Sequence, residues 1–286
     1  MKRFAHLLQV FAVVAILFNS CKKSTSTSPA EKQGSNFNKL LKTISRNVSG
    51  TQLSITTHYS YSVTGELSEV TREFTDPSAS SSVNKDVYYR KQNGELDSII
   101  FLDVSNPQTP AFQNFYKTEF HYDAGGKIDF ALNRSLTSYN DSCVYTYLGS
   151  NISQRYLYRK AVGSSSYSLL VTLNYDYDAA GNLVNLSAVW SNPASSKNST
   201  YTYDNKPGSL PVREFENELF GFWIKAFDNT YKGNNNPLSR RISSPEDWEW
   251  SNIDYDYQYS ANNKVLYQKI MHTGTPDFYE VFYYYD

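Results

Sequence analysis

Apolar and polar residues alternate in short runs along most of this chain. In Val171–Tyr177 and again in Ile253–Tyr259, every second residue is apolar or aromatic and the residues between are polar. A period of two is typical of a strand with one buried and one solvated face. The first run is followed by a turn rich in Asp, Ala, Gly and Asn at 178–182, and then by the apolar residue Leu183. This order predicts a β-hairpin.

The same unit recurs along the chain, and a tyrosine ends the first strand of each copy. The copies lie 25 to 33 residues apart, and an aliphatic residue follows each of the first eight tyrosines by five to seven positions. The tyrosines are Tyr61, Tyr89, Tyr122, Tyr147, Tyr177, Tyr203, Tyr231, Tyr259 and Tyr285, and the aliphatic residues are Leu67, Leu96, Ile128, Ile152, Leu183, Leu210, Leu238 and Val265. A repeat of about 27 residues holds two strands and two turns. The pattern predicts an all-β, antiparallel up-and-down meander of about 17 strands.

So many strands are expected to close on themselves. An open twisted sheet rarely exceeds about ten strands, so we expect a closed barrel or a flattened barrel. We favour the flattened form, with opposite walls in contact, because an apolar inner face is unsuited to line a wet lumen. The alternative is a membrane-spanning barrel, but 19% charged residues and tyrosines in mid-strand argue against a lipid-facing wall.

The N-terminal segment has the features of an export signal. Lys2 and Arg3 precede a short apolar stretch, Leu7–Phe18, that ends shortly before Cys21. The segment before Cys21 resembles the lipobox of bacterial lipoproteins, which implies a lipid on the Cys21 thiol. The alternative is an ordinary secretory signal with an incidental cysteine. We therefore divide the chain into a signal peptide (1–20), a lipid-anchored flexible tether rich in Lys, Ser and Thr (21–49), and one β-repeat domain (50–286).

The sequence contains no recognisable catalytic or metal-binding constellation. It lacks His-Glu-x-x-His, a cysteine pair and Gly-x-Ser-x-Gly, so we expect no enzyme activity, catalytic residue, metal site or cofactor. The net charge is −1 and there is no basic stripe, which argues against nucleic-acid binding. Four tryptophans are candidates for stacking on a glycan or peptide, although packing in the core is the alternative for each. They are Trp190, Trp223, Trp248 and Trp250.

Two motifs resemble known families. The segments 122–128 and 177–183 resemble the YD repeat, Tyr-Asp-x-x-Gly-x-Leu, of Rhs-type and teneurin-type shells. The whole-chain pattern is similar to DUF4595-like lipoproteins of Bacteroidota, which have no known function, because Tyr-Asp-Asn-Lys-Pro at 203–207 and Asn-Asn-Pro-Leu at 235–238 occur in their order. The second Asn-Pro of the first segment is missing here. This resemblance implies a porin-like fold and carries no activity or active-site residue.

The leading hypothesis is therefore a non-enzymatic binding or scaffold module, exported and lipid-anchored to the cell envelope, with the periplasmic face of the outer membrane favoured. The membrane is the expected partner through the N-terminal lipid. The second hypothesis is an accessory lipoprotein that binds a glycan or peptide through surface Trp and Tyr.

Overall fold

The computed structural model describes ten segments that together form one compact unit, Lys39–Asp286. They are residues 39–48, 53–76, 82–104, 112–135, 139–161, 163–192, 196–208, 234–243, 252–274 and 278–286. Predictions about the signal peptide, Cys21, Leu210, Tyr231 and three of the four tryptophans fall outside these residues.

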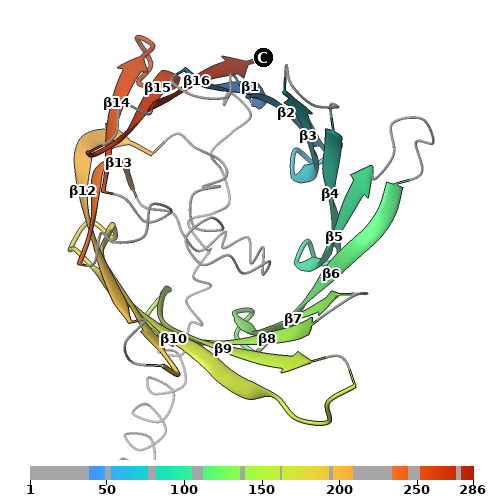
Figure 1. Ribbon diagram of the computed structural model, residues 1–286. Helices are drawn as coiled ribbons and strands as arrows, with labels where there is room; N and C mark the ends of the chain where they lie inside the picture. The colour runs from blue at the N-terminus through green and yellow to red at the C-terminus, as the bar shows by residue number, and fades with distance from the viewer. Residues whose placement is uncertain are drawn as a thin grey trace, which may run out of the picture. The chain divides into compact units, whose positions relative to one another are not determined.

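The described segments form sixteen β-strands in a single closed sheet. Each strand pairs antiparallel with its neighbours in the chain, and β1 pairs with β16 to close the ring (Figure 1). The strands are β1 (Leu40–Asn47), β2 (Ser54–Tyr61), β3 (Leu67–Thr75), β4 (Ser82–Arg90), β5 (Leu96–Val104), β6 (Phe112–Tyr122), β7 (Ile128–Ser135), β8 (Tyr139–Leu148), β9 (Asn151–Ala161), β10 (Ser168–Tyr177), β11 (Leu183–Trp190), β12 (Lys197–Pro207), β13 (Asn235–Ile242), β14 (Ile253–Tyr259), β15 (Val265–His272) and β16 (Phe278–Tyr285). The predicted all-β meander with a closed, barrel-like sheet is confirmed.

A β-bulge recurs in every odd-numbered strand, just after the strand begins. On β7, for example, Ile128 pairs with Tyr122 and Phe130 pairs with His121, so Asp129 is an extra residue without an opposite partner. The eight extra residues are Leu41, Ser68, Asp97, Asp129, Ser153, Val184, Leu238 and Leu266. All eight bulges lie at the end of the barrel that carries the short turns, which we call the turn rim. A repeated bulge adds twist and bend to a sheet, as closure into a barrel requires.

The turns at this rim have the geometry that the sequence predicts. In the β10–β11 turn, the Gly181 N–H donates to the Asp178 carbonyl oxygen (3.0 Å), and Gly181 has a φ of 80°. Glycine adopts that left-handed conformation without the steric penalty of a side chain.

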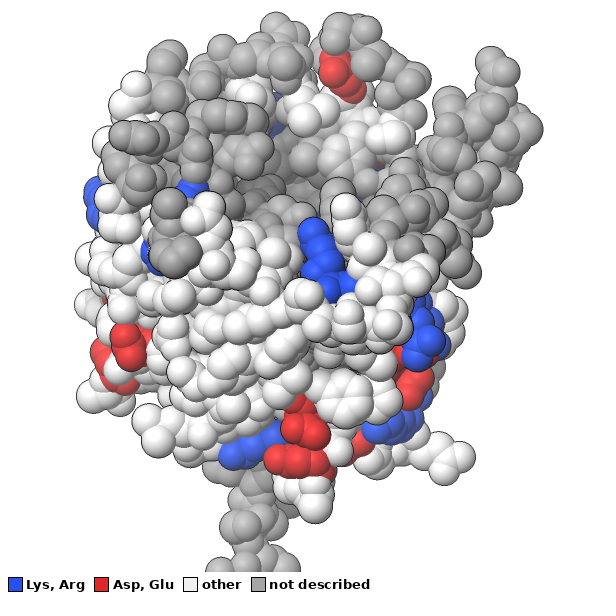
Figure 2. Space-filling view, turned by 60° about the horizontal axis from the view of Figure 1, so that its bottom comes forward, with Lys and Arg blue, Asp and Glu red and all other residues white. Residues whose placement is uncertain are grey.

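The two faces of the sheet differ in character. One face carries the buried apolar residues, such as Val70, Val171 and Val265, and in a closed ring this is the inner face. The outer face carries ion pairs such as Lys85–Glu69 (2.8 Å). Figure 2, which turns the lower side of Figure 1 toward the viewer, shows small groups of acidic and basic side chains among uncharged ones on the wall. The outer face thus carries charged pairs among uncharged side chains, which include Val87, Ile100 and Leu132.

The strands surround one ring (Figure 1), which differs from the predicted flattened form with opposite walls in contact. The reason is that the inner face is less apolar than the strand pattern suggested. It includes the buried polar residues Asp86, Asn133, Asp141 and Gln268. Many of these groups bond along the wall, as Asp141 does with Arg159 at 2.8 and 2.9 Å.

Three further details differ from the sequence prediction. The predicted tether reached residue 49, but β1 occupies Leu40–Asn47, so the barrel begins before residue 50. Tyr89 points outward and is exposed, and Arg90 takes the position opposite Leu96 that tyrosine holds in other repeats. On β13 the aliphatic position opposite Tyr203 is taken by Pro237, and Leu238 is the extra residue of the bulge.

Candidate functional site

A polar cluster joins two segments that lie more than 50 residues apart at the turn rim. Asn182 ends the β10–β11 turn and is buried. Its side-chain N–H donates to Asn235 Oδ1 (3.0 Å), and its Oδ1 accepts from the backbone N–H of Asn235 (3.0 Å). Asn235 Nδ2 in turn donates to the Lys206 carbonyl oxygen (3.0 Å). The turn is thereby fixed to the ends of β12 and β13, and we call this group the Asn clasp (Asn182, Asn235, Lys206).

Asp178 stands at the start of the same turn. Its carboxylate accepts from the backbone N–H of Asn182 (2.8 Å) and from Asn182 Nδ2 (3.0 Å). These hydrogen bonds, with that of the Asn182 side chain the largest contribution, lower the pKa of Asp178 below its ordinary value. Asp178 is exposed and ionised at neutral pH.

Asp204 lies on the side of β12 that faces away from Asp178 and Asn182, and its hydrogen bonds link neighbouring strands. Its carboxylate accepts from the backbone N–H groups of Lys206 and Asn236 (3.0 Å each) and from the Tyr259 hydroxyl. Burial raises the pKa of the Tyr259 phenol, and the hydrogen bond to Asp204 raises it further. Asp204 therefore fixes the end of β12 to β13 and β14.

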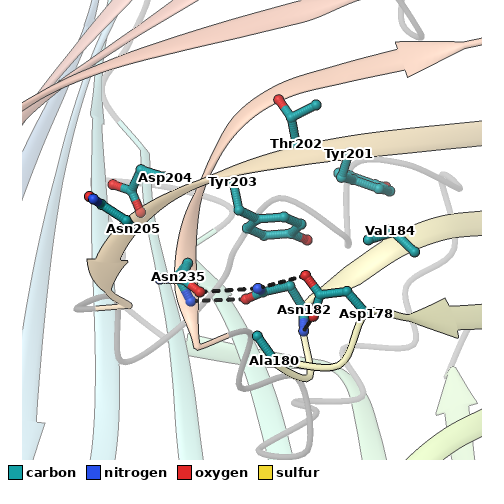
Figure 3. Close-up of a pocket in the computed structure, with 10 residues that line it drawn as sticks. All are labelled: Asp178, Ala180, Asn182, Val184, Tyr201, Thr202, Tyr203, Asp204, Asn205 and Asn235. Carbon is teal, nitrogen blue, oxygen red and sulfur yellow. Dashed lines mark hydrogen bonds between the residues drawn. The ribbon is translucent and has the colours of Figure 1, made fainter.

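A shallow pocket of about 500 Å³ lies beside the Asn clasp, where β11 and β12 diverge. Backbone pairing between these strands is confined to Asn185–Ala188 and Lys197–Thr200, which leaves a gap toward the turn rim. The lining residues are Asp178, Ala180, Asn182, Val184, Tyr201, Thr202, Tyr203, Asp204, Asn205 and Asn235. Figure 3 shows the Tyr203 ring above Asn182 with its hydroxyl directed toward Val184 and Asp178, whereas Asp204 and Asn205 lie on the opposite side of β12.

This combination of groups suits binding better than catalysis. Half-buried tyrosine rings offer flat apolar surface, and an ionised carboxylate with neighbouring amides offers hydrogen bonds to hydroxyl groups. A glycosidase needs two carboxyl groups facing one bond, one of them with a raised pKa. Here the pKa of Asp178 is lowered, and Asp204 points away. In the described ranges, no group of three or more His, Cys, Asp or Glu side chains is placed to hold a metal ion.

Trp190 is the one predicted stacking residue that lies within the described residues. Trp190 ends β11, pairs with Val171 and is half-buried against the hydrophobic core. Trp223, Trp248, Trp250 and the lipidation residue Cys21 lie outside the described residues. The pocket residues escaped the sequence analysis, although the segments 203–207 and 235–238 were singled out as motifs. The structure brings these two segments together, with Pro207 opposite Asn235.

Comparison with solved structures identifies the fold. The chain is similar to a porin-like protein from Bacteroides uniformis, with a TM-score of 0.62 and 13% identity over 87% of this chain and 99% of that one. A porin-like protein from Bacteroides vulgatus aligns over the same shares with a TM-score of 0.47 and 12% identity. At such low identity the first match shows a shared barrel fold alone.

No protein-family model matches the chain, and no curated protein matches it. The YD-repeat and DUF4595-like resemblances thus gain no support from these comparisons. The described part of the chain contains no helix with the length and apolar character that crossing a membrane requires.

Proposed function

We propose that this chain is a lipid-anchored barrel of the bacterial cell envelope, attached through Cys21, that acts as a non-enzymatic binding or scaffold module. The export signal and the lipobox-like segment before Cys21 support attachment. The shared fold with a porin-like Bacteroides protein supports an envelope location.

The charged pairs on the outer wall are the observation that carries the proposal of an anchored rather than a membrane-spanning barrel. Lys117 and Arg134 both pair with Glu119 on that wall, at 2.9 and 3.0 Å, and Arg241 pairs with Asp254 near the opposite side of the ring. A wall in contact with lipid needs an apolar band about 25 Å tall, and charged side chains at mid-depth destabilise it by about 2–4 kcal/mol each.

Expression of the wild-type chain and of Cys21→Ser in a Bacteroides host tests the attachment. We expect mass spectrometry of the wild type to show an acylated N-terminal Cys21, and we expect Cys21→Ser to leave the membrane fraction. A Cys21→Ser protein that stays in the membrane after carbonate extraction would instead support the spanning barrel.

The pocket beside the Asn clasp favours a second, more specific role as a binding site for a polyhydroxylated ligand such as a glycan. Tyr203 supplies a stacking surface and Asp178 an exposed, ionised acceptor. We expect glycan-array binding by the wild type that Tyr203→Ala and Asp178→Ala each reduce at least about tenfold. Tyr139→Ala, which removes an exposed tyrosine at the rim opposite to the pocket, is the matched control and should bind like the wild type. Equal binding by all four proteins would reject the pocket as the site.

A further inference from the structure

The extra residues of the eight bulges are not distributed at random around the turn rim. On four consecutive odd-numbered strands they are apolar, and on the other four they are polar. The apolar set is Val184 on β11, Leu238 on β13, Leu266 on β15 and Leu41 on β1, and the polar set is Ser68 on β3, Asp97 on β5, Asp129 on β7 and Ser153 on β9. Because the barrel closes between β1 and β16, each set occupies one continuous half of the rim.

The apolar half exposes a group of large side chains around the closing strands. Four are between 40 and 44% exposed, and Val63, at the tip of the adjacent β2–β3 turn, is fully exposed. We call these five residues the seam patch: Leu41, Val63, Leu238, Leu266 and Tyr284. On the rest of the described rim, Tyr89 and Leu148 are the large exposed apolar side chains. Clustered exposed apolar groups are typical of an interaction surface, whereas isolated ones need no explanation.

Three lysine side chains lie over tyrosine rings in or beside the seam patch. Lys42 Nζ lies over the Tyr284 ring at 4.7 Å from its centroid, and Lys264 Nζ lies over the Tyr285 ring at 4.9 Å. Lys39, the first described residue, lies over the Tyr61 ring at 5.2 Å. The polar half of the rim carries lysines over tyrosine rings as well, Lys91 over Tyr122 at 4.6 Å and Lys127 over Tyr147 at 5.0 Å, but there they stand among the acidic residues Glu95, Asp97, Asp123 and Asp129. A surface with aromatic and aliphatic side chains beside lysines suits an anionic membrane interface.

The position of Lys39 relates this patch to the proposed anchor. Lys39 lies at the turn rim beside Asp286, the residue that follows β16, because the Lys39 carbonyl oxygen accepts from the Asp286 N–H at 3.1 Å. Residues 22–38 connect this point to Cys21. A lipid on Cys21 therefore attaches the barrel at this sector of the rim rather than at the opposite one.

We propose that the seam patch rests in the membrane interface, with Leu41, Leu266 and Tyr284 among the headgroups and the barrel wall in water. This inference rests on the proposed envelope location. The patch is too narrow to span a bilayer, and it acts as a second, weak contact beside the acyl chains. Its effect is to fix which rim of the barrel faces the membrane.

The test uses the mature chain from residue 21 with Cys21→Ser, so that no lipid is attached and the outcome is independent of acylation. Sedimentation with vesicles of phosphatidylglycerol and phosphatidylethanolamine measures partitioning. We expect Leu41→Ser/Leu266→Ser to lower the partition coefficient about tenfold. The matched control, Tyr89→Ser/Leu148→Ser, removes two exposed apolar groups from the same rim outside the patch and should change partitioning by less than twofold.

Site-specific fluorescence gives an independent reading in the same background. Cys143 is buried, so a fluorophore attached to Leu266→Cys or Leu148→Cys reports one position. We expect a blue shift on vesicle addition at position 266 and none at 148. Absence of vesicle binding, equal loss in both double variants, or equal shifts at both positions would overturn the proposal, as would a patch-dependent dimer in solution. Acylation of Cys21, measured separately, would remain unaffected by any of these results.

Discussion

The Tyr122 hydroxyl on β6 donates a hydrogen bond of 2.9 Å to the carbonyl oxygen of Leu96, the first residue of β5. The same contact recurs around the ring, from Tyr61 to Leu40, from Tyr147 to Ile128 and from Tyr285 to Val265, at 2.9 to 3.0 Å. In each case the last tyrosine of an even-numbered strand satisfies the first carbonyl of the preceding strand. The recurrent tyrosine therefore links neighbouring strands through its hydroxyl group and also packs against the core.

Removing one such hydroxyl should weaken the barrel modestly. Tyr122→Phe leaves the Leu96 carbonyl without this donor, and we expect a loss of about 1 kcal/mol in the free energy of unfolding. Urea denaturation measures it. Tyr89→Phe, on an exposed outward ring, is the control and should cost less than about 0.5 kcal/mol. Equal effects would show that the carbonyl contact adds nothing.

The aliphatic partner of each tyrosine should matter more. Leu183 is fully buried opposite Tyr177, so Leu183→Ala should destabilise the barrel by about 2–4 kcal/mol through lost burial and a residual cavity. Leu148→Ala removes an exposed leucine and should be nearly neutral. Thermal and urea unfolding of both variants would separate core packing from simple loss of apolar surface.

The ion pairs of the two faces should differ in their contribution. Asp86 is fully buried and pairs with Arg72 at 2.8 Å on the inner face. Arg72→Met leaves a buried carboxylate without that cation, and we expect a loss of about 3–5 kcal/mol. Lys85→Met breaks the partly exposed pair with Glu69 on the outer face and should cost about 0–1 kcal/mol. If the two losses were alike, burial of Asp86 would add nothing to the contribution of its ion pair.

The Asn clasp should make Asp178 a source of acid sensitivity. The pKa of Asp178 is lowered in the folded protein, so its stabilising contribution is present above the unfolded pKa of about 4 and is lost as the pH falls through the folded value. Asn182→Ala should move the pKa of Asp178 back toward its ordinary value, as measured by carboxyl carbon NMR. It should also weaken the acid dependence of unfolding below about pH 4. Asn205→Ala, beside the clasp, is the control and should leave both unchanged.

Tyr267 should produce the opposite dependence at alkaline pH. Burial, and then the hydrogen bond to Glu280, raises its pKa to about 12. The stabilising effect is complete below the unfolded pKa of about 10 and declines between pH 10 and 12. Tyr267→Phe should flatten the fall in stability in that window relative to the wild type. Tyr284→Phe, on an exposed ring of the next strand, should keep the wild-type slope.

The strand repeat could be predicted because its signals are local. Alternation, turn glycines and the tyrosine each act within one hairpin, so they appear in a short window of sequence. Strand β1 was not predicted because Leu40–Asn47 contains no such tyrosine and pairs with β16, which lies more than 200 residues away in the sequence. The ring shape escaped because pairing among inner polar groups, such as Arg72 with Asp86, depends on register. The candidate site could not be predicted for a similar reason. Asn182 precedes β11 and Asn235 begins β13, so these residues meet only when β12 has paired with both strands.

The bulge and the tyrosine-to-carbonyl bond each involve a single strand pair. A chain with one hairpin more or one fewer would therefore keep these contacts in every remaining strand pair, and only the circumference of the barrel would change. Relatives of this barrel should accordingly differ in circumference by steps of two strands. The bulge and the tyrosine-to-carbonyl hydrogen bond should recur in each hairpin, whereas the diameter of the barrel should vary.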